Sequence, residues 1–120
     1  MAGDRLDIDV RQHRIGFPVV SLAGPVDIST CEGLREVLLK LIEGGNVHLV
    51  LDMERVPYVD SAGLGVLVAA RRSVGPCGGS VRIAKPSTMV QRVLEITRLT
   101  DVFGIYPDVE SALGGGEAAP

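Results

Sequence analysis

A serine between an aspartate and two closely spaced glycines is the part of this 120-residue chain best suited to chemistry. The segment reads Asp60-Ser61-Ala62-Gly63-Leu64 and opens a long apolar stretch typical of a helix. A serine at a helix N-terminus is accessible to a kinase, and the helix dipole stabilises a phosphate placed there. A phosphate on Ser61 would add a charge of about −1.5 to −2 beside Asp60. The segment therefore predicts a phosphorylation site whose charge controls the binding of a partner.

Glycines in the first turn of this predicted helix need an explanation. Gly63 and Gly65 each cost roughly 1 kcal/mol of helix stability relative to alanine. They either allow the helix to pack closely against its own sheet or allow the backbone of a partner to dock. Leu64, near the exposed end of the helix, is the candidate for apolar contact with a partner.

A second loop, which contains Asp27, follows an earlier predicted strand. Loops at the carboxyl ends of neighbouring strands meet at one edge of an open α/β sheet, so we expect Asp27 and Asp60 to lie close together. We expect both carboxylates to be exposed and to tune recognition without holding the fold. The predicted partner-binding set is Asp27, Asp60, Ser61, Ala62, Gly63 and Leu64.

The other reactive side chains do not form a recognisable site. Cys31 and Cys77 have no metal-ligand spacing to each other or to His13 and His48. We expect both cysteines to be reduced and structural, with a redox role as the alternative. No phosphate-binding loop and no nucleophile-elbow motif occurs in the sequence. These observations predict a protein that is not an enzyme, with no catalytic residue, no metal and no cofactor.

Composition limits the class of partner. The chain has a net charge of −3 and no basic cluster larger than Arg71-Arg72, which argues against nucleic acid. No apolar run approaches the roughly 18–20 residues of a membrane span, and the N-terminus is not followed by a signal-peptide core. We expect a cytoplasmic protein that does not enter membranes.

The pattern of apolar residues predicts the strands. Leu6, Ile8 and Val10 alternate with charged residues, and a second apolar run covers 19–23. About seven residues connect these strands, too few for a parallel crossover, so they should form an antiparallel hairpin. Three further strands are predicted at 47–52, 81–84 and 102–106.

Four helical segments are also predicted. Ser29 and Glu32 have the spacing of a capping box for the first helix, and glycines at 44 and 45 end it. The second helix is predicted over 61–73. A third begins with Thr88 and Gln91 as its caps, and a last turn covers 108–113. The chain thus predicts a single domain, 1–113, with a flexible tail, 114–120.

This order of elements places the chain in the α/β class. It predicts a mixed sheet of about five strands, with an antiparallel hairpin first and the remainder largely parallel, packed by about four helices.

The motifs resemble one known family. The run from Val59 to Val68 is similar to the phosphorylation loop of bacterial STAS-domain anti-sigma factor antagonists. The loop Gly24-Pro25-Val26-Asp27 is similar to the family's Gly-x-x-Asp loop, except that Pro25 stands where the family often has Glu. The run from Ile96 to Phe103 resembles the family's closing motif.

The resemblance implies partner switching. The unmodified antagonist binds an anti-sigma factor, which is usually a GHKL-type serine kinase, and thereby releases a sigma factor for transcription. Phosphorylation of Ser61 by that kinase would end the binding, and a serine phosphatase would restore it. The chain is expected to be a monomer or a weak dimer.

Other assemblies remain open as alternatives. A STAS module also occurs in stressosome-type scaffolds and in accessory subunits of lipid transporters. A receiver domain is the remaining α/β candidate because Asp52 ends a predicted central strand. Receivers need an acidic pair at the end of their first strand, whereas Asp7 and Asp9 alternate along one.

Overall fold

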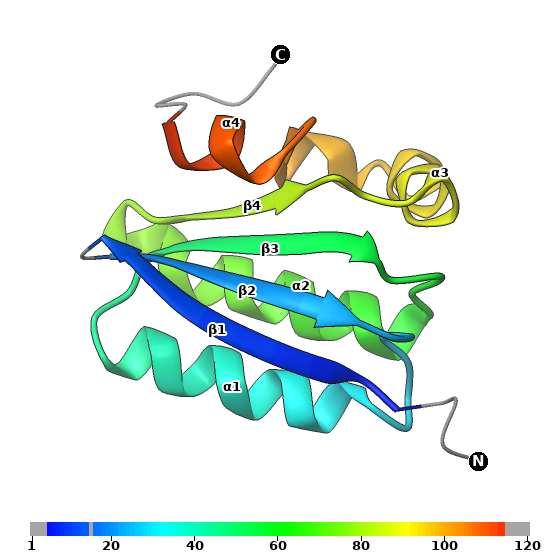
Figure 1. Cartoon of the computed structure of the whole chain (residues 1–120), viewed down its shortest axis with the longest axis horizontal. Coiled ribbons are helices and arrows are strands. Elements are labelled where there is room, and N and C mark those ends of the chain that lie inside the picture. Colours follow the sequence, from blue (N-terminus) through cyan, green and yellow to red (C-terminus); the bar gives the residue numbers. More distant parts are fainter. Residues whose placement is uncertain (1–4, 15, 115–120) are drawn as a thin grey trace.

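A computed structural model describes residues 5–14 and 16–114 and contains one five-stranded sheet with the strand order β1-β2-β3-β4-β5 (Figure 1). The strands are β1 (Asp7–Arg14), β2 (Phe17–Ala23), β3 (His48–Arg55), β4 (Ser80–Ala84) and β5 (Gly104–Tyr106). Four α-helices accompany them: α1 (Cys31–Glu43), α2 (Ser61–Val74), α3 (Thr88–Ile96) and α4 (Val109–Gly114). Short 3₁₀ turns occupy Gly75–Cys77 and Leu99–Asp101. The predicted fold class is therefore confirmed.

The first two strands pair antiparallel, as predicted, but their connection is shorter than expected. Both strands extend further than the apolar pattern, so only residues 15 and 16 separate β1 from β2. Gly16 has a φ of 85°, a conformation that glycine adopts without strain and that a tight turn requires. The pairing places Val10 opposite Val20.

The remaining strands pair in parallel and bring their carboxyl ends to one edge of the sheet. β2 pairs with β3, β3 with β4 and β4 with β5, each in parallel. β3 continues three residues beyond the predicted end at Asp52 because Met53 is buried in the core. The loops that follow β2 and β3 consequently emerge side by side.

The predicted capping residues of two helices are wrong. α1 begins at Cys31 with Thr30 at the N-cap position, so the capping box of Ser29 and Glu32 does not form. Ser29 instead hydrogen-bonds to a neighbouring carboxylate in the preceding loop. α3 is capped by Ser87, whose hydroxyl accepts from the amide of Val90, and Thr88 is already helical.

Alternation along the strands produces a hydrophobic cluster on each face of the sheet. α1 and α2 lie side by side over one face and bury Leu34, Leu38 and Leu67 against the strands. α3 adds Val90 and Leu94 to the same cluster. On the other face a smaller cluster packs under α4, which supplies Ala112 and Leu113 to it.

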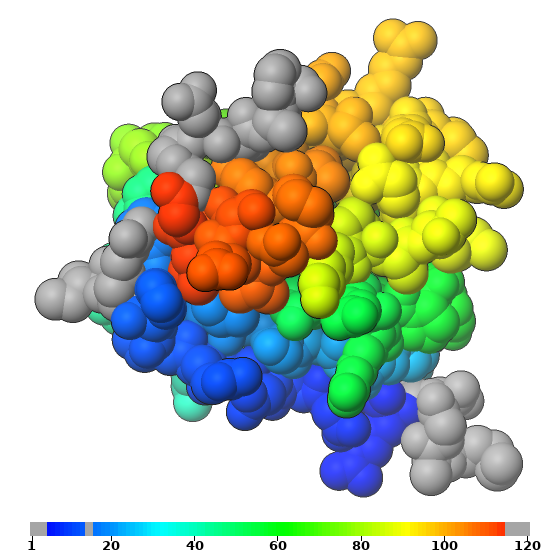
Figure 2. All heavy atoms as spheres, turned by 45° about the horizontal axis from the view of Figure 1, so that its top comes forward, coloured from blue at the N-terminus to red at the C-terminus, as the bar shows by residue number. Residues whose placement is uncertain are grey.

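The second face is only partly covered. α4, orange-red in Figure 2, lies over part of the molecule, while β1, in dark blue, stays at the surface. The predicted tail, 114–120, falls outside the described residues except for Gly114, which ends α4. Within residues 5–14 and 16–114, no helix combines the length and hydropathy needed to cross a membrane.

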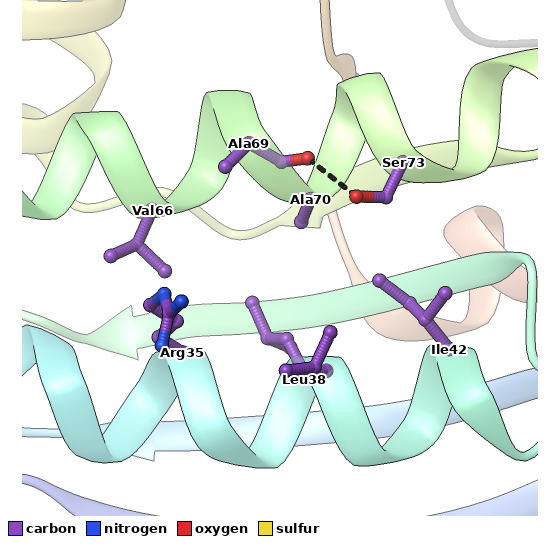
Figure 3. Close-up of a pocket in the computed structure, with 8 residues that line it drawn as sticks. Arg35, Leu38, Ile42, Val66, Ala69, Ala70 and Ser73 are labelled. Carbon is purple, nitrogen blue, oxygen red and sulfur yellow. Dashed lines mark hydrogen bonds between the residues drawn. The ribbon is translucent and has the colours of Figure 1, made fainter.

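A groove of about 160 Å³ separates the exposed sides of α1 and α2 (Figure 3). Apolar side chains, including Leu38, Ile42 and Val66, line most of it. The hydroxyl of Ser73 donates to the carbonyl of Ala69 at 3.1 Å, so the helix itself satisfies this polar group. Ala69, Ala70 and Ser73 of α2 are small and leave the groove open. The residues that line it include no pair of groups suited to acid–base chemistry.

One charged side chain fastens α4 to the sheet. Arg82 of β4 is only 7% exposed, and its Nη1 donates to the carbonyl of Ala112 at 2.7 Å. Its Nε donates to Ser80 Oγ at 3.1 Å, and its guanidinium lies 5.2 Å from the ring centroid of Phe17. A buried guanidinium is tolerated because its donors are used and aromatic rings pack against it.

We predict that Arg82→Ala will lower the free energy of unfolding by about 2–3 kcal/mol. The variant loses buried packing and leaves the carbonyl of Ala112 without its donor. Urea titration monitored by circular dichroism measures the change. The matched control is Arg72→Ala on the exposed side of α2, which should stay within about 0.5 kcal/mol of wild type. Equal effects of the two substitutions would contradict the assigned role of Arg82.

Candidate functional site

Two loops meet at the carboxyl edge of the sheet and are joined by their backbones. An isolated parallel bridge pairs Val26, after β2, with Val59, after β3. The amide of Val26 donates to the carbonyl of Tyr58 at 3.1 Å, and the amide of Asp60 donates to the carbonyl of Val26 at 3.2 Å. The expectation that the loops of Asp27 and Asp60 lie together is confirmed.

Asp60, and not Ser61, caps helix α2. Its Oδ1 accepts from the amide of Gly63 at 2.9 Å, the geometry of an N-cap side chain. Its Oδ2 accepts from the amide of Ile28, in the other loop, at 3.1 Å. One carboxylate thus uses both oxygens to hold the two loops together.

Asp27 organises the loop that leads into α1. Its Oδ1 accepts from the amide and hydroxyl of Ser29 and from the amide of Thr30, at 3.0, 2.8 and 3.2 Å. Its Oδ2 accepts from the Tyr58 hydroxyl at 2.9 Å. These donors, the Ser29 hydroxyl first and Tyr58 second, lower the pKa of Asp27 below its usual 3.8. Both aspartates fix the geometry of the loops, which argues against the expectation that they only tune recognition.

Ser61 is the first residue of α2 and its side chain is exposed. Among the hydrogen bonds of residues 5–14 and 16–114, none involves its hydroxyl, because Asp60 already provides the cap. Ser61 is therefore accessible and unused by the fold.

The two helix glycines have different surroundings. Gly63 is buried, and a Cβ at this position would overlap the carbonyl oxygen and side chain of Val26. Close packing against the protein's own sheet, the first of the two readings of this glycine, therefore accounts for Gly63. A Cβ on Gly65 would meet no atom within 4 Å, so Gly65 lies on the open side of the helix. Ala62 and Leu64 are half-buried.

Sequence reasoning missed an exposed apolar residue in this site. Ile28 is 75% exposed although its amide is held by Asp60. Tyr58, also exposed, reaches across to the first loop through its hydroxyl. The signal available in the sequence was Ile28 itself, a large aliphatic residue directly after Asp27, because an exposed apolar patch often marks a binding surface.

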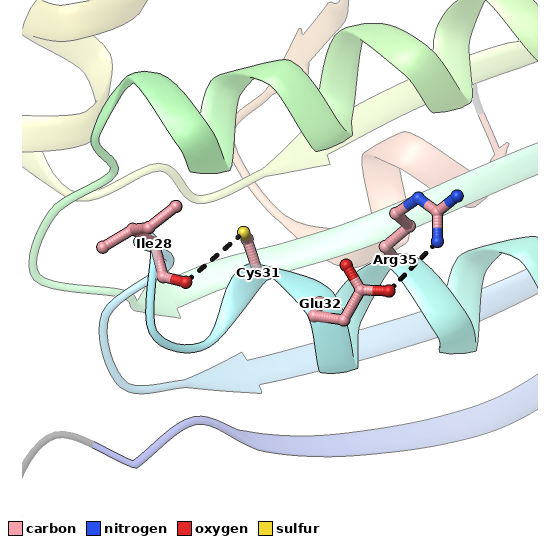
Figure 4. Close-up of polar contacts among 4 residues, drawn as sticks. All are labelled: Ile28, Cys31, Glu32 and Arg35. Carbon is pink, nitrogen blue, oxygen red and sulfur yellow. Dashed lines mark hydrogen bonds and ion pairs between the residues drawn. The ribbon is translucent and has the colours of Figure 1, made fainter.

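The two cysteines lie apart. Cys77 is exposed beyond α2, and Cys31 is half-buried in the first turn of α1, with its thiol 3.8 Å from the carbonyl of Ile28 (Figure 4). The same view shows the ion pair of Glu32 and Arg35 on α1, whose atoms are 3.1 Å apart. The described part of the chain contains no group of three His, Cys, Asp or Glu side chains that could hold a metal ion.

A mixed sheet with two neighbouring helices on one face and an exposed serine at the start of the second helix defines the class. This arrangement is the STAS domain, and the family model described as "STAS domain" matches residues 8–112.

Curated and solved relatives identify the branch of this family. The anti-sigma-B factor antagonist of Bacillus subtilis (strain 168) is 35% identical over 108 residues, which cover 90% of this chain and 97% of the relative. The crystal structure of an anti-sigma factor antagonist from Mycobacterium paratuberculosis is 27% identical, with a TM-score of 0.83 and 92% of both chains covered. The chain therefore belongs to the STAS-domain family of anti-sigma factor antagonists, which confirms the resemblance of its motifs.

A second solved structure shares the fold and is in a phosphorylated state. The Bacillus cell fate determinant SpoIIAA in its phosphorylated form has a TM-score of 0.73, with 20% identity, 89% of this chain covered and 96% of the other. At this identity the comparison concerns the fold alone.

We predict that Asp60→Ala will lower the free energy of unfolding by about 1–2 kcal/mol, the usual cost of losing an N-cap. Asp60→Asn should cost less because asparagine also caps well, although its amide nitrogen cannot accept from Ile28. Urea unfolding measures both. The exposed Asp101 provides the control, and its replacement by alanine should be nearly neutral. A neutral Asp60→Ala would show that the observed cap contributes nothing.

The stabilising contribution of Asp27 should depend on pH. Because its pKa is lower in the folded state, the contribution is complete above the unfolded value near 3.8 and is lost as pH falls through the folded value. The stability difference between wild type and Asp27→Ala should therefore be constant from about pH 5 to 7 and shrink below about pH 3.8. Urea midpoints across this range give the result; a difference that widens in acid would contradict it.

Proposed function

We propose that this chain is an anti-sigma factor antagonist whose binding is controlled by phosphorylation of Ser61. The unmodified form binds an anti-sigma factor in the cytoplasm and thereby frees a sigma factor for transcription. The observation that carries the proposal is the exposed Ser61 hydroxyl, which the fold does not use, at the start of a helix already capped by Asp60.

The site suits reversible modification because phosphate and fold do not conflict. A phosphate on Ser61 would sit at the positive end of the α2 dipole, which stabilises negative charge by up to about 1–2 kcal/mol. The Asp60 carboxylate at the same helix end offsets part of that gain by repulsion. The domain should consequently remain folded when Ser61 is modified.

Binding is the property that should change. The unmodified surface offers a neutral hydroxyl beside the apolar side chains of Ile28 and Leu64. A doubly charged group within a buried interface, with no cation opposite, costs several kcal/mol. That cost corresponds to a loss of at least about a hundredfold in affinity. The positions proposed to contact the partner are Ile28, Ser61, Ala62 and Leu64, while Asp27, Asp60 and Gly63 hold them in place.

The partner is proposed to be an anti-sigma factor with GHKL-type serine kinase activity, and a serine phosphatase is proposed to reverse the modification. The names of the relatives support an anti-sigma factor as partner, and the accessibility of Ser61 supports a kinase and a phosphatase that act on it. The chain itself is proposed to contribute no catalytic group.

We predict that Ser61→Ala will retain an anti-sigma factor from native bacterial lysate, whereas Ser61→Asp will lose it. Mass spectrometry of the retained proteins identifies the partner, and calorimetry should then show at least about a hundredfold weaker binding for phospho-Ser61 protein. Ser73→Asp, another exposed serine on α2, is the matched control and should bind as wild type does. Equal binding of modified and unmodified protein would refute the switch, and recovery of a transporter ATPase would favour the alternative assembly.

A further inference from the structure

Strand β1 forms one edge of the sheet and has no strand on its outer side among the described residues (Figure 1). An edge strand presents the N–H and C=O groups of every second residue without a partner, which makes it a template for another strand. β1 is eight residues long, and its register on β2 is regular from Asp7 to Gln12. Figure 2 shows this strand at the surface.

The charged side chains on one face of β1 change sign from the N-terminal to the C-terminal side of Val10. Asp7, Asp9 and Arg11 project on the face opposite α1 and α2, where they line an open depression together with Ser21 and Asp52. Acidic residues thus precede Val10, and a basic residue follows it at the same spacing. Antiparallel pairing of β1 with β1 of a second copy, centred on Val10, would place Asp9 opposite Arg11 in both directions.

Other registers of the same pairing bring like charges together. Paired residues must share a face of the sheet, so the two registers nearest to this one are centred on Asp9 and on Arg11. The first places Asp9 against Asp9 of the second copy, and the second places Arg11 against Arg11. Like charges directly opposite each other are unfavourable. The register centred on Asp9 also pairs Asp7 with Arg11, but it opposes the two Asp9 carboxylates. Of these three registers, only the one centred on Val10 pairs opposite charges without opposing like ones.

The side chains at this centre are available for pairing. Val10 is 40% exposed, although its strand neighbour Val20 is fully buried. Asp9 and Arg11 form a 3.8 Å contact within their own strand, but their side chains are 72% and 80% exposed. Such exposed pairs are weak and exchange partners readily.

We propose that β1 is a self-association surface, through which two copies of this chain join antiparallel into one continuous sheet with a two-fold axis at Val10. The contact is isologous, since each copy offers the same strand. It is small, so the dimer should be weak and concentration-dependent. The two-fold axis places the Ser61 loops of the two copies at opposite ends, so the assembly does not rest on the proposed function and leaves both loops open.

Charge reversal tests the register. In sedimentation velocity from about 10 μM to 1 mM, the average mass of wild type should rise from 12.7 kDa towards twice that value. Asp9→Arg and Arg11→Glu alone should remain monomers. An equimolar mixture of these two variants should associate again, and so should the Asp9→Arg/Arg11→Glu double variant, because opposite charges then face each other.

The matched controls carry the same charge changes on exposed helix positions. Glu36→Arg on α1 and Arg72→Glu on α2 should associate as wild type does, and circular dichroism should show every variant folded. Wild type that stays monomeric at the highest concentration would overturn the proposal. Single reversals that associate as strongly as wild type, or a mixture that fails to associate, would also overturn it.

Discussion

The carboxylate of Asp60 is the interaction on which the candidate site depends. One oxygen caps the N-terminus of α2 by accepting a hydrogen bond from the amide of Gly63. The other accepts from the amide of Ile28 in the neighbouring loop. Because β2 and β3 are parallel neighbours, their loops already emerge together, and the bridge between Val26 and Val59 sets their separation. Gly63 then lets the helix approach Val26 to a distance that any side chain would prevent. The site is thus a rigid platform and Ser61 is its free element.

Much of this architecture could be predicted from residue patterns. The direction of strand pairing followed from connection lengths, because a short link requires antiparallel pairing and a helical link permits parallel pairing. Apolar residues of α1 recur at helical spacing, and two that lie four residues apart on one face, Leu34 and Leu38, are in the core. The neighbourhood of Asp27 and Asp60 followed from the rule that loops at the carboxyl ends of adjacent strands meet.

Local capping could not be predicted because several hydroxyl and carboxylate groups compete for the same amides. Ser29, Thr30 and Asp27 all lie within reach of the start of α1, and spacing alone favoured Ser29. In the structure the Thr30 hydroxyl instead donates to the carbonyl of Pro25, and Asp27 accepts from both neighbours. The same ambiguity exists at the start of α2, where Asp60 and Ser61 are both suitable capping residues and Asp60 forms the cap. Only tertiary contacts, such as that between Asp60 and Ile28, decide between these arrangements.

Asp60 caps α2 whereas the fold does not use the Ser61 hydroxyl, and this difference has an evolutionary consequence. Folding constrains position 60 and leaves position 61 open, so under the proposed switch a single codon change at 61 would remove the response to a kinase while leaving the fold intact. A duplicated gene could in this way yield a constitutive binder from a regulated one in a single mutational step. Selection could therefore change the regulation of binding through residue 61 without changing the fold.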